Sequence, residues 1–324
     1  MDVCMTRNRL VKTAASVLLT LLLLYYFYRT VDFRQVALYV KGVQWGWMAA
    51  AALAYCLNYP VRAFRIYYLT RHAGQKSYLQ TLQICCRHQF YGRIIPFKVG
   101  DLSLVYLLKQ IRGVSLGVGG AVLLLIRLFD GVIIILSFLI CNLQVNLRVL
   151  PGWVLLLILA AAIGFVLVSP CLIACVAGWL KRSPAANRPA VKKIENTAEK
   201  IEEMMKSSVA TPKNILVIGL ISLVMWFFVY FSMHGVVRAF GQDISFYQTV
   251  VASFLASAAA FLPINGIGGF GMVETGWTLG FTLLGMERAA ALSSGIVSNT
   301  MSFLLICMFG MLSYLPIWRN RKGN

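Results

Sequence analysis

Three carboxylates lie in segments of the sequence that are expected to be embedded in a membrane. The chain has 11 Asp and Glu residues, but only Asp101, Asp130 and Glu274 fall in such segments. A charged side chain at the centre of a bilayer costs at least about 2.5 kcal/mol, so an ionisable residue kept there is a functional hypothesis by default. We expect these three residues to balance charge or to carry a proton.

Four basic residues share the same segments: Arg87, Arg93, Lys98 and Arg127. An arginine holds a phosphate through two parallel hydrogen bonds, and a lysine holds it as a point charge. The four residues therefore favour binding of an anionic lipid head group that enters from the cytoplasmic leaflet. The alternative is that they only anchor an amphipathic helix among the head groups.

Local pairing is the alternative for two of the carboxylates. Arg127 and Asp130 lie three positions apart on one predicted helix, so their side chains can meet on its surface. Asp101 can be neutralised by Lys98 or Arg93, which precede it in the sequence. In this interpretation the ion pairs are structural.

Glu274 has no basic neighbour close by in the sequence, and the nearest one downstream is Arg288. An unpaired carboxylate is costly inside a membrane. Glu274 therefore either pairs across the fold, for which Arg93 and Arg127 are candidates, or carries a proton. The second possibility predicts a role in proton coupling.

The composition places these charges in a membrane protein. Of 324 residues, 59% are hydrophobic, and the mean hydropathy is +0.75. The 30 Lys and Arg residues give a net charge of +19, which indicates either nucleic acid or an anionic membrane surface as the partner. The high mean hydropathy favours the membrane surface over nucleic acid. Because no series of segments alternates polar and apolar residues as a barrel requires, we predict an all-α polytopic membrane protein.

Six transmembrane spans are predicted, because a bilayer core needs about 20 apolar residues per helix. They cover residues 13–28, 42–61, 113–146, 153–180, 214–237 and 289–318. No small-residue cleavage site follows the first stretch, so we interpret it as an uncleaved span rather than a signal peptide. The positive-inside rule places both termini in the cytoplasm and the protein in the cytoplasmic (inner) membrane.

Two further segments, residues 78–109 and 244–285, do not fit a simple span. The first is too polar to cross a bilayer, and the second is apolar but broken by Pro and Gly. Both ends of each segment belong on one side of the membrane, so we predict two re-entrant helical hairpins. The candidate hinges are Pro96 and Gly100 in the first hairpin and Pro263, Gly268 and Gly271 in the second.

The two halves of the chain follow one plan of two spans, a broken hairpin and one more span. Residues 1–148 begin in the cytoplasm and residues 149–324 begin outside, which predicts an inverted-topology repeat. Residues 181–213 form a basic linker, predicted as an amphipathic helix on the cytoplasmic surface or as a solvated connector. In transporters, paired Gly/Pro-interrupted segments of inverted halves mark a site near the bilayer midplane.

Most of the histidines and several glycines indicate structure rather than chemistry, but His88, beside Arg87, could assist phosphate binding. His72, His88 and His234 have no spacing that suits a metal, and we predict no metal, no cofactor and no catalytic residue. Gly276 and Gly280 are four positions apart, which favours close approach of another helix.

Three motifs in the same order resemble a known family. They are the segment Arg93–Leu102, the segment Arg127–Asp130 and the glycine-rich segment Leu262–Glu274. They are similar to motifs of the flippase-like membrane family that includes the integral-membrane part of lysylphosphatidylglycerol synthases. Phe97 and Lys98 depart from the usual Gly and Arg of that family. The last span often carries a basic residue there, where this chain has Ser298, Asn299 and Thr300.

The resemblance, together with the paired hairpins, implies a lipid transporter, or flippase, for an anionic phospholipid or a polyprenyl-phosphate lipid. The basic residues named above would hold the head group, and the carboxylates would orient them or balance their charge. No soluble aminoacyl-transferase domain follows, so lysyl transfer is not expected. The alternative is a non-transporting subunit that scaffolds a glycosyltransferase or a lipid-modifying enzyme. A homo-oligomer remains open.

Overall fold

The computed structural model describes residues 41–71, 77–95, 99–145, 211–261 and 270–315, with single residues at 73, 196 and within 151–168. The predicted first span, most of the fourth span and most of the basic linker lie outside these residues. Four predicted site residues also lie outside them: Pro96, Lys98, Pro263 and Gly268. The described part of the chain is helical and contains no strand, as the all-α prediction requires.

The described elements are α3 (Trp45–Leu69), α4 (Tyr78–Ile94), the short 3-10 helix η1 (Val99–Leu102), α5 (Ser103–Arg112), α6 (Leu116–Val145), α9 (Pro212–Ala239), α10 (Phe246–Phe261), α11 (Met272–Leu283) and α12 (Arg288–Leu312). Among them α6, α9 and α12 are long and apolar enough to cross a membrane. They coincide with three predicted spans, although α12 ends at Leu312 rather than at Trp318.

The predicted second span ends too early. α3 continues for 25 residues, through Pro60 and as far as Leu69. Proline inside a helix removes one backbone hydrogen bond and usually kinks or breaks the helix. The helix nevertheless continues past Pro60. The hydroxyl of Tyr78, at the start of α4, donates to the carbonyl of Pro60 at 3.1 Å and so joins α3 to α4. The longer helix includes Arg62 and Arg65, which the sequence had suggested for a cytoplasmic loop.

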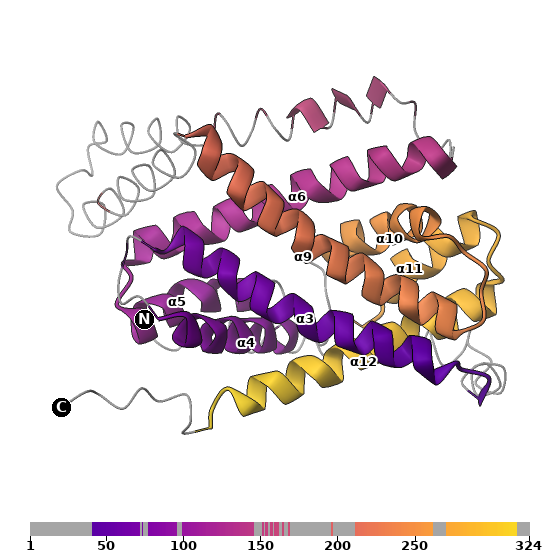
Figure 1. The fold of residues 1–324 in the computed structure, drawn as a ribbon, viewed down its shortest axis with the longest axis horizontal. Coiled ribbons are helices and arrows are strands. Elements are labelled where there is room, and N and C mark those ends of the chain that lie inside the picture. The colour runs from indigo at the N-terminus through magenta and orange to yellow at the C-terminus, as the bar shows by residue number, and fades with distance from the viewer. Residues whose placement is uncertain are drawn as a thin grey trace, which may run out of the picture.

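Each predicted hairpin is a pair of helices separated by a break. Figure 1 shows α4 and α5 toward one end of the long axis, and α10 and α11 toward the other. α3 and α9 pack against each other and run diagonally between the two pairs. α12 touches both pairs, because it contacts α4 and α11. α6, the last described helix of the first half, likewise touches both pairs, because it contacts α5 and α10.

The contacts between helices have counterparts in the two halves of the chain. The contacts α3–α4, α4–α5 and α5–α6 correspond to α9–α10, α10–α11 and α11–α12. Between the halves, α4–α12 corresponds to α6–α10. This pattern is the one that two copies of a single plan would give. The re-entrant geometry and the repeat itself remain predictions.

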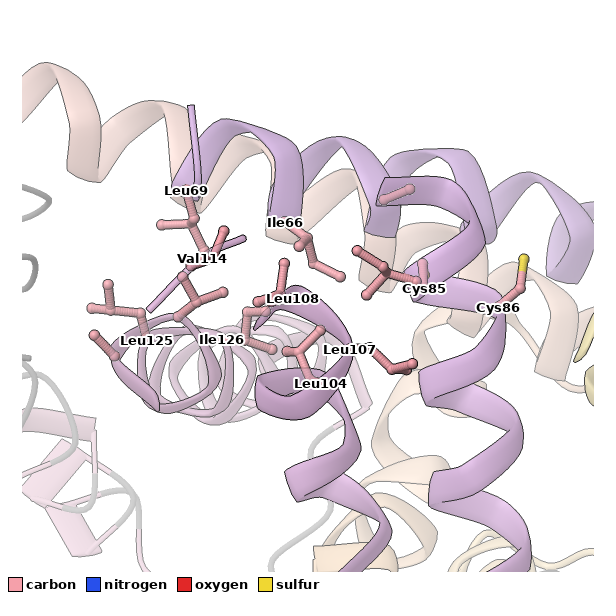
Figure 2. Close-up of a cluster of buried hydrophobic side chains, with 14 of the residues drawn as sticks. Ile66, Leu69, Cys85, Cys86, Leu104, Leu107, Leu108, Val114, Leu125 and Ile126 are labelled. Carbon is pink, nitrogen blue, oxygen red and sulfur yellow. The ribbon is translucent and has the colours of Figure 1, made fainter. Parts of the chain in front are cut away.

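A cluster of buried apolar side chains fixes the first helix pair. Leu104, Leu107 and Leu108 of α5 lie on one helical face and are buried against α6 and α4 (Figure 2). Cys85 and Cys86 of α4 belong to the same cluster and are free thiols. The cluster holds α5, and with it the η1 turn that carries Asp101.

Two glycines of α11 allow α10 to approach closely, as predicted. A Cβ atom on Gly276 would lie 2.7 Å from the carbonyl oxygen of Leu255, and one on Gly280 would lie 2.8 Å from the carbonyl carbon of Ala252. Neither position can carry a larger side chain without moving a helix. The second helix pair is therefore held by backbone contact, whereas the first is held by leucine packing.

Candidate functional site

Asp130 pairs with an arginine from α3. The Nη1 atom of Arg65 lies 2.6 Å from Oδ1 of Asp130, and the two side chains are 1% and 4% exposed. Arg65 also donates to the hydroxyl of Ser222 at 3.0 Å, and the indole of Trp226 donates to Asp130 at 3.1 Å. These extra hydrogen bonds are what make a buried ion pair tolerable. The predicted local pair of Arg127 with Asp130 is wrong, because Arg65 of α3 and Trp226 of α9 are the partners of Asp130.

Arg127 instead binds the carboxylate of the first hairpin. Its Nη2 atom lies 2.5 Å from Oδ2 of Asp101, and the two side chains are 35% and 21% exposed. Arg93 does not neutralise Asp101, because it donates to Asn299 and Ser302 of α12 instead. Lys98 lies outside the described residues, so its pairing with Asp101 stays a prediction. The ion pair joins α6 to η1.

Two predicted hinge glycines have clear local reasons in the structure. A Cβ atom on Gly100 would lie 2.7 Å from Cα of Gly92, so glycine lets η1 lie directly against α4. Gly271 has a φ of +95°, a value that favours glycine, and it precedes α11 as its N-cap. A hinge role for either residue stays a prediction.

Glu274 is 1% exposed and lies in the first turn of α11. Its Oε2 atom accepts a hydrogen bond from the backbone N–H of Gly271 at 2.8 Å. Its Oε1 atom accepts from the side-chain amide of Asn299 at 2.7 Å. Arg93 donates from Nη2 to Oδ1 of Asn299 at 2.5 Å and to the hydroxyl of Ser302 at 3.1 Å. An amide on α12 therefore stands between the carboxylate of the second hairpin and the guanidinium of the first.

One cavity of about 270 Å³ is lined by several of these side chains, namely Arg93, Asp101, Arg127, Asp130, Asn299 and Ser302, whereas Glu274 and Arg65 do not line it. Every described helix except α5 contributes to its lining. Its charged lining consists of Arg62, Arg93, Arg127, Asp101 and Asp130, and its large aromatic lining consists of Tyr55, Trp226 and Trp277. The cavity thus combines cationic groups with apolar walls, as a site for an amphiphilic ligand requires.

Arg62 is the site residue that the sequence analysis missed. Its Nε atom donates to Oδ1 of Asn58 at 3.1 Å, and Nη1 has a longer contact of 3.5 Å with the amide oxygen of Gln89. A usable signal was present, because Tyr55, Asn58, Arg62 and Arg65 recur every three or four residues. This spacing places four polar side chains on one face of an apolar helix.

Arg93 and Arg62 have only uncharged hydrogen-bond partners among the residues that the structure describes. The Nε atom of Arg93 is also buried without a hydrogen-bond partner there. A guanidinium has five N–H donors and no acceptor. Both side chains therefore keep donors for a ligand in the cavity.

Arg87 does not line the cavity. It donates from Nη2 to the backbone carbonyl of Ser313 at 3.0 Å, and its guanidinium lies 4.0 Å from the ring centre of Tyr314. Gln83 donates to the same carbonyl at 2.8 Å. A cation at a helix C-terminus is favourable. The structure thus gives Arg87 a capping role at the end of α12 and corrects its prediction as a phosphate ligand.

The fold and the site together define a helical membrane protein with a buried, partly cationic cavity. The family described as the lysylphosphatidylglycerol synthase TM region matches residues 13–310, and the chain belongs to this family. The resemblance inferred from the three sequence motifs is therefore confirmed. Comparisons with curated proteins and with solved structures gave no match.

Proposed function

We propose that this protein is a transporter that moves a phosphate-bearing lipid between the two leaflets of the cytoplasmic membrane. The observation that carries the proposal is the pair Arg62 and Arg93, which line one cavity and have only uncharged partners among the described residues. A phosphate accepts charge-assisted, bidentate hydrogen bonds from guanidinium groups. It would also satisfy the buried Nε atom of Arg93.

The distribution of charge supports an anionic ligand. Asp130 is neutralised by Arg65, and Asp101 by Arg127. Glu274 lies behind Arg93, with Asn299 between them. The charge of Arg62 is thus left without a balancing carboxylate among the described residues, and a phosphate would supply one.

The paired helix contacts support a transport mechanism. If the halves are inverted repeats, the same contacts can form on either side of the cavity, which is the arrangement that alternating access uses. In this proposal the two hairpins enter from opposite faces, both termini lie in the cytoplasm, and the cavity opens to each leaflet in turn. The lipid is an anionic phospholipid or a polyprenyl phosphate, and the protein performs no chemistry on it.

Leaflet exchange in proteoliposomes tests the proposal. Fluorescent phosphatidylglycerol and a fluorescent polyprenyl phosphate would be compared for the native chain, Arg62→Gln, Arg93→Gln and the control Arg87→Gln. A hydrogen bond to a charged group contributes about 1.5–3 kcal/mol, so we expect each cavity variant to lose about tenfold or more in rate. The control should keep the native rate.

Failure of folded native protein to move either lipid would contradict the proposal. It would favour the alternative, a subunit that scaffolds a lipid-modifying enzyme. In that case replacement of the buried charges would weaken assembly with the enzyme partner and would change no transport rate.

A further inference from the structure

Two asparagines hold the two cavity arginines in nearly the same way. Asn58 accepts from Arg62 with its oxygen and donates with its nitrogen to the backbone carbonyl of Met225 at 2.9 Å. Asn299 accepts from Arg93 with its oxygen and donates with its nitrogen to Glu274 at 2.7 Å. Both amides are buried, at 4% and 3% exposure. The two arrangements differ only in the last acceptor.

The partners fix the direction of each amide. An arginine only donates hydrogen bonds, and an ionised carboxylate only accepts them, whereas an amide has one accepting end and one donating end. Both oxygens of ionised Glu274 accept from N–H groups, Oε2 from Gly271 and Oε1 from Asn299. A protonated carboxyl keeps one accepting oxygen and turns the other into a donor. Because the backbone N–H of Gly271 cannot turn, it keeps the accepting oxygen, and Asn299 must turn to accept the O–H and then presents its N–H groups to Arg93.

The amide of Asn58 has no such alternative, because the carbonyl of Met225 does not take up a proton. Arg62 is consequently held in one orientation at any pH. Arg93 is held only in one charge state of its neighbour. The cavity thus has one fixed cationic group and one whose position depends on a carboxylate in the other hairpin.

We infer that Asn299 is a positioning residue that links the protonation of Glu274 in the second hairpin to the orientation of Arg93 in the first. The inference rests on the proposed function, because it assigns Arg93 to the lipid phosphate. When Glu274 takes up a proton, Asn299 stops accepting from Arg93, and the guanidinium turns its donors into the cavity. The site then gains net positive charge and binds phosphate more tightly.

The surroundings of Glu274 favour this link. α11 packs against α10 and α12, and neither helix brings a charged residue to Glu274 in the described part of the chain. Across α12, Arg93 of α4 is the charged group whose field acts on it. Its side chain accepts one hydrogen bond within its own turn, from the backbone N–H of Gly271, and one from another helix, from Asn299 of α12. A change in its charge is therefore transmitted first to Asn299.

The test measures how a short-chain phosphate lipid raises the unfolding temperature of the purified full chain. Dihexanoyl-phosphatidylglycerol would be added to native protein, Asn299→Leu, Glu274→Gln and the matched control Asn58→Leu, in a pH series from about 8 to about 5. Asn58→Leu removes the same amide from the other arginine. Asn299→Ala serves as a second variant if the leucine prevents folding.

In the native chain and in Asn58→Leu, we expect the lipid-induced shift to grow as the pH falls. Glu274→Gln should give the large shift at every pH, because the N–H of Gly271 holds the oxygen of the glutamine and its amide N–H group then faces Asn299. Asn299→Leu and Asn299→Ala should lose most of the pH dependence. If they keep the full pH dependence of the native chain, the link is overturned.

The outcomes separate this link from the proposed function. A pH-dependent shift with no lipid movement in proteoliposomes would overturn transport and leave the link standing. Lipid movement with a shift that is independent of pH in the native chain would overturn the link and leave transport standing. No lipid-induced shift in the native chain at any pH would overturn the link as well.

Discussion

Arg62 and Arg93 line the same cavity, yet they are attached to different parts of the molecule. Arg62 belongs to α3, and its asparagine donates to the backbone of α9, the helix against which α3 packs. Arg93 belongs to the first hairpin and reaches the second one only through α12. The first attachment ends on a group that cannot change its charge, and the second ends on one that can.

The two attachments divide the site into a fixed side, formed by Arg62 and Asn58, and a responsive side, formed by Arg93, Asn299 and Glu274. A Cβ atom on Gly235 of α9 would lie 2.9 Å from Cβ of Ala51 on α3, so these two helices are in close contact. The buried pair of Arg65 and Asp130 also ties α3 to α6 on this side. On the responsive side, one amide carries the polar connection that the structure describes between the hairpins. In the proposed function, the fixed side positions the lipid phosphate and the responsive side determines how firmly it is held.

The largest effect is expected on the fixed side. Arg65→Met leaves Asp130 buried without its ion-pair partner, which costs about 3–5 kcal/mol of unfolding free energy. Adding Asp130→Leu should recover more than half of this loss, because two apolar side chains need no solvation. Denaturant unfolding of the purified protein measures both values. No recovery in the double variant would show that the ion pair is not the source of the loss.

A smaller effect is expected where the second hairpin packs. Gly280→Ala forces α11 away from α10 and should cost about 1–3 kcal/mol. It should also weaken the pH dependence of lipid binding, because the movement displaces Glu274 from Asn299. Gly219→Ala is the matched control, since a Cβ atom there meets nothing within 4 Å. Equal stabilities of the two variants would contradict the close packing of α10 and α11.

The pH dependence of lipid exchange should differ between Asn58→Leu and Asn299→Leu. Asn58→Leu deprives Arg62 and the Met225 carbonyl of their partner, so the rate of lipid exchange should fall by about tenfold at every pH. Asn299→Leu should alter the rate most at neutral pH and little at acidic pH, because the inferred link requires a protonated Glu274 at acidic pH. Proteoliposome assays across the pH range distinguish the two patterns. Identical profiles of exchange rate against pH for the two variants would contradict the distinction between a fixed and a responsive side.

The smallest effect is expected for Arg87→Gln. The side chain interacts with the C-terminal carbonyls of α12 and with Tyr314, away from the cavity. A cation at a helix C-terminus contributes about 0.3–1 kcal/mol, so stability should fall by no more than this. The exchange rate should be unchanged. A large loss of exchange at equal stability would return Arg87 to the list of phosphate ligands.

Long apolar stretches allowed α6, α9 and α12 to be predicted from the sequence, and Pro and Gly revealed the breaks in both hairpins. The family and the three carboxylates of the membrane-embedded segments could also be predicted from the sequence. The end of α3 was missed because Arg62 and Arg65 were taken as the end of a span. A helix can continue past such residues when its polar face turns toward a partner helix.

The partners of the carboxylates could not be predicted from spacing alone. Arg127 and Asp130 have the spacing of a helical pair, yet Asp130 pairs with Arg65, whose side chain reaches it from α3. Asn299 was noted only as a departure from a basic residue. Its role depends on α4, α11 and α12 meeting at one point, which no local pattern records.

The most direct test of the account is a measurement of contact between the lipid phosphate and the two arginines. Solid-state NMR detects dipolar coupling between the phosphorus of phosphatidylglycerol and ¹⁵N-labelled guanidinium groups in bilayers that contain the protein. If Arg62 and Arg93 bind the lipid phosphate, the coupling weakens in Arg62→Gln and in Arg93→Gln but not in Arg87→Gln. A coupling that survives in both cavity variants, or that disappears only in Arg87→Gln, would contradict the account.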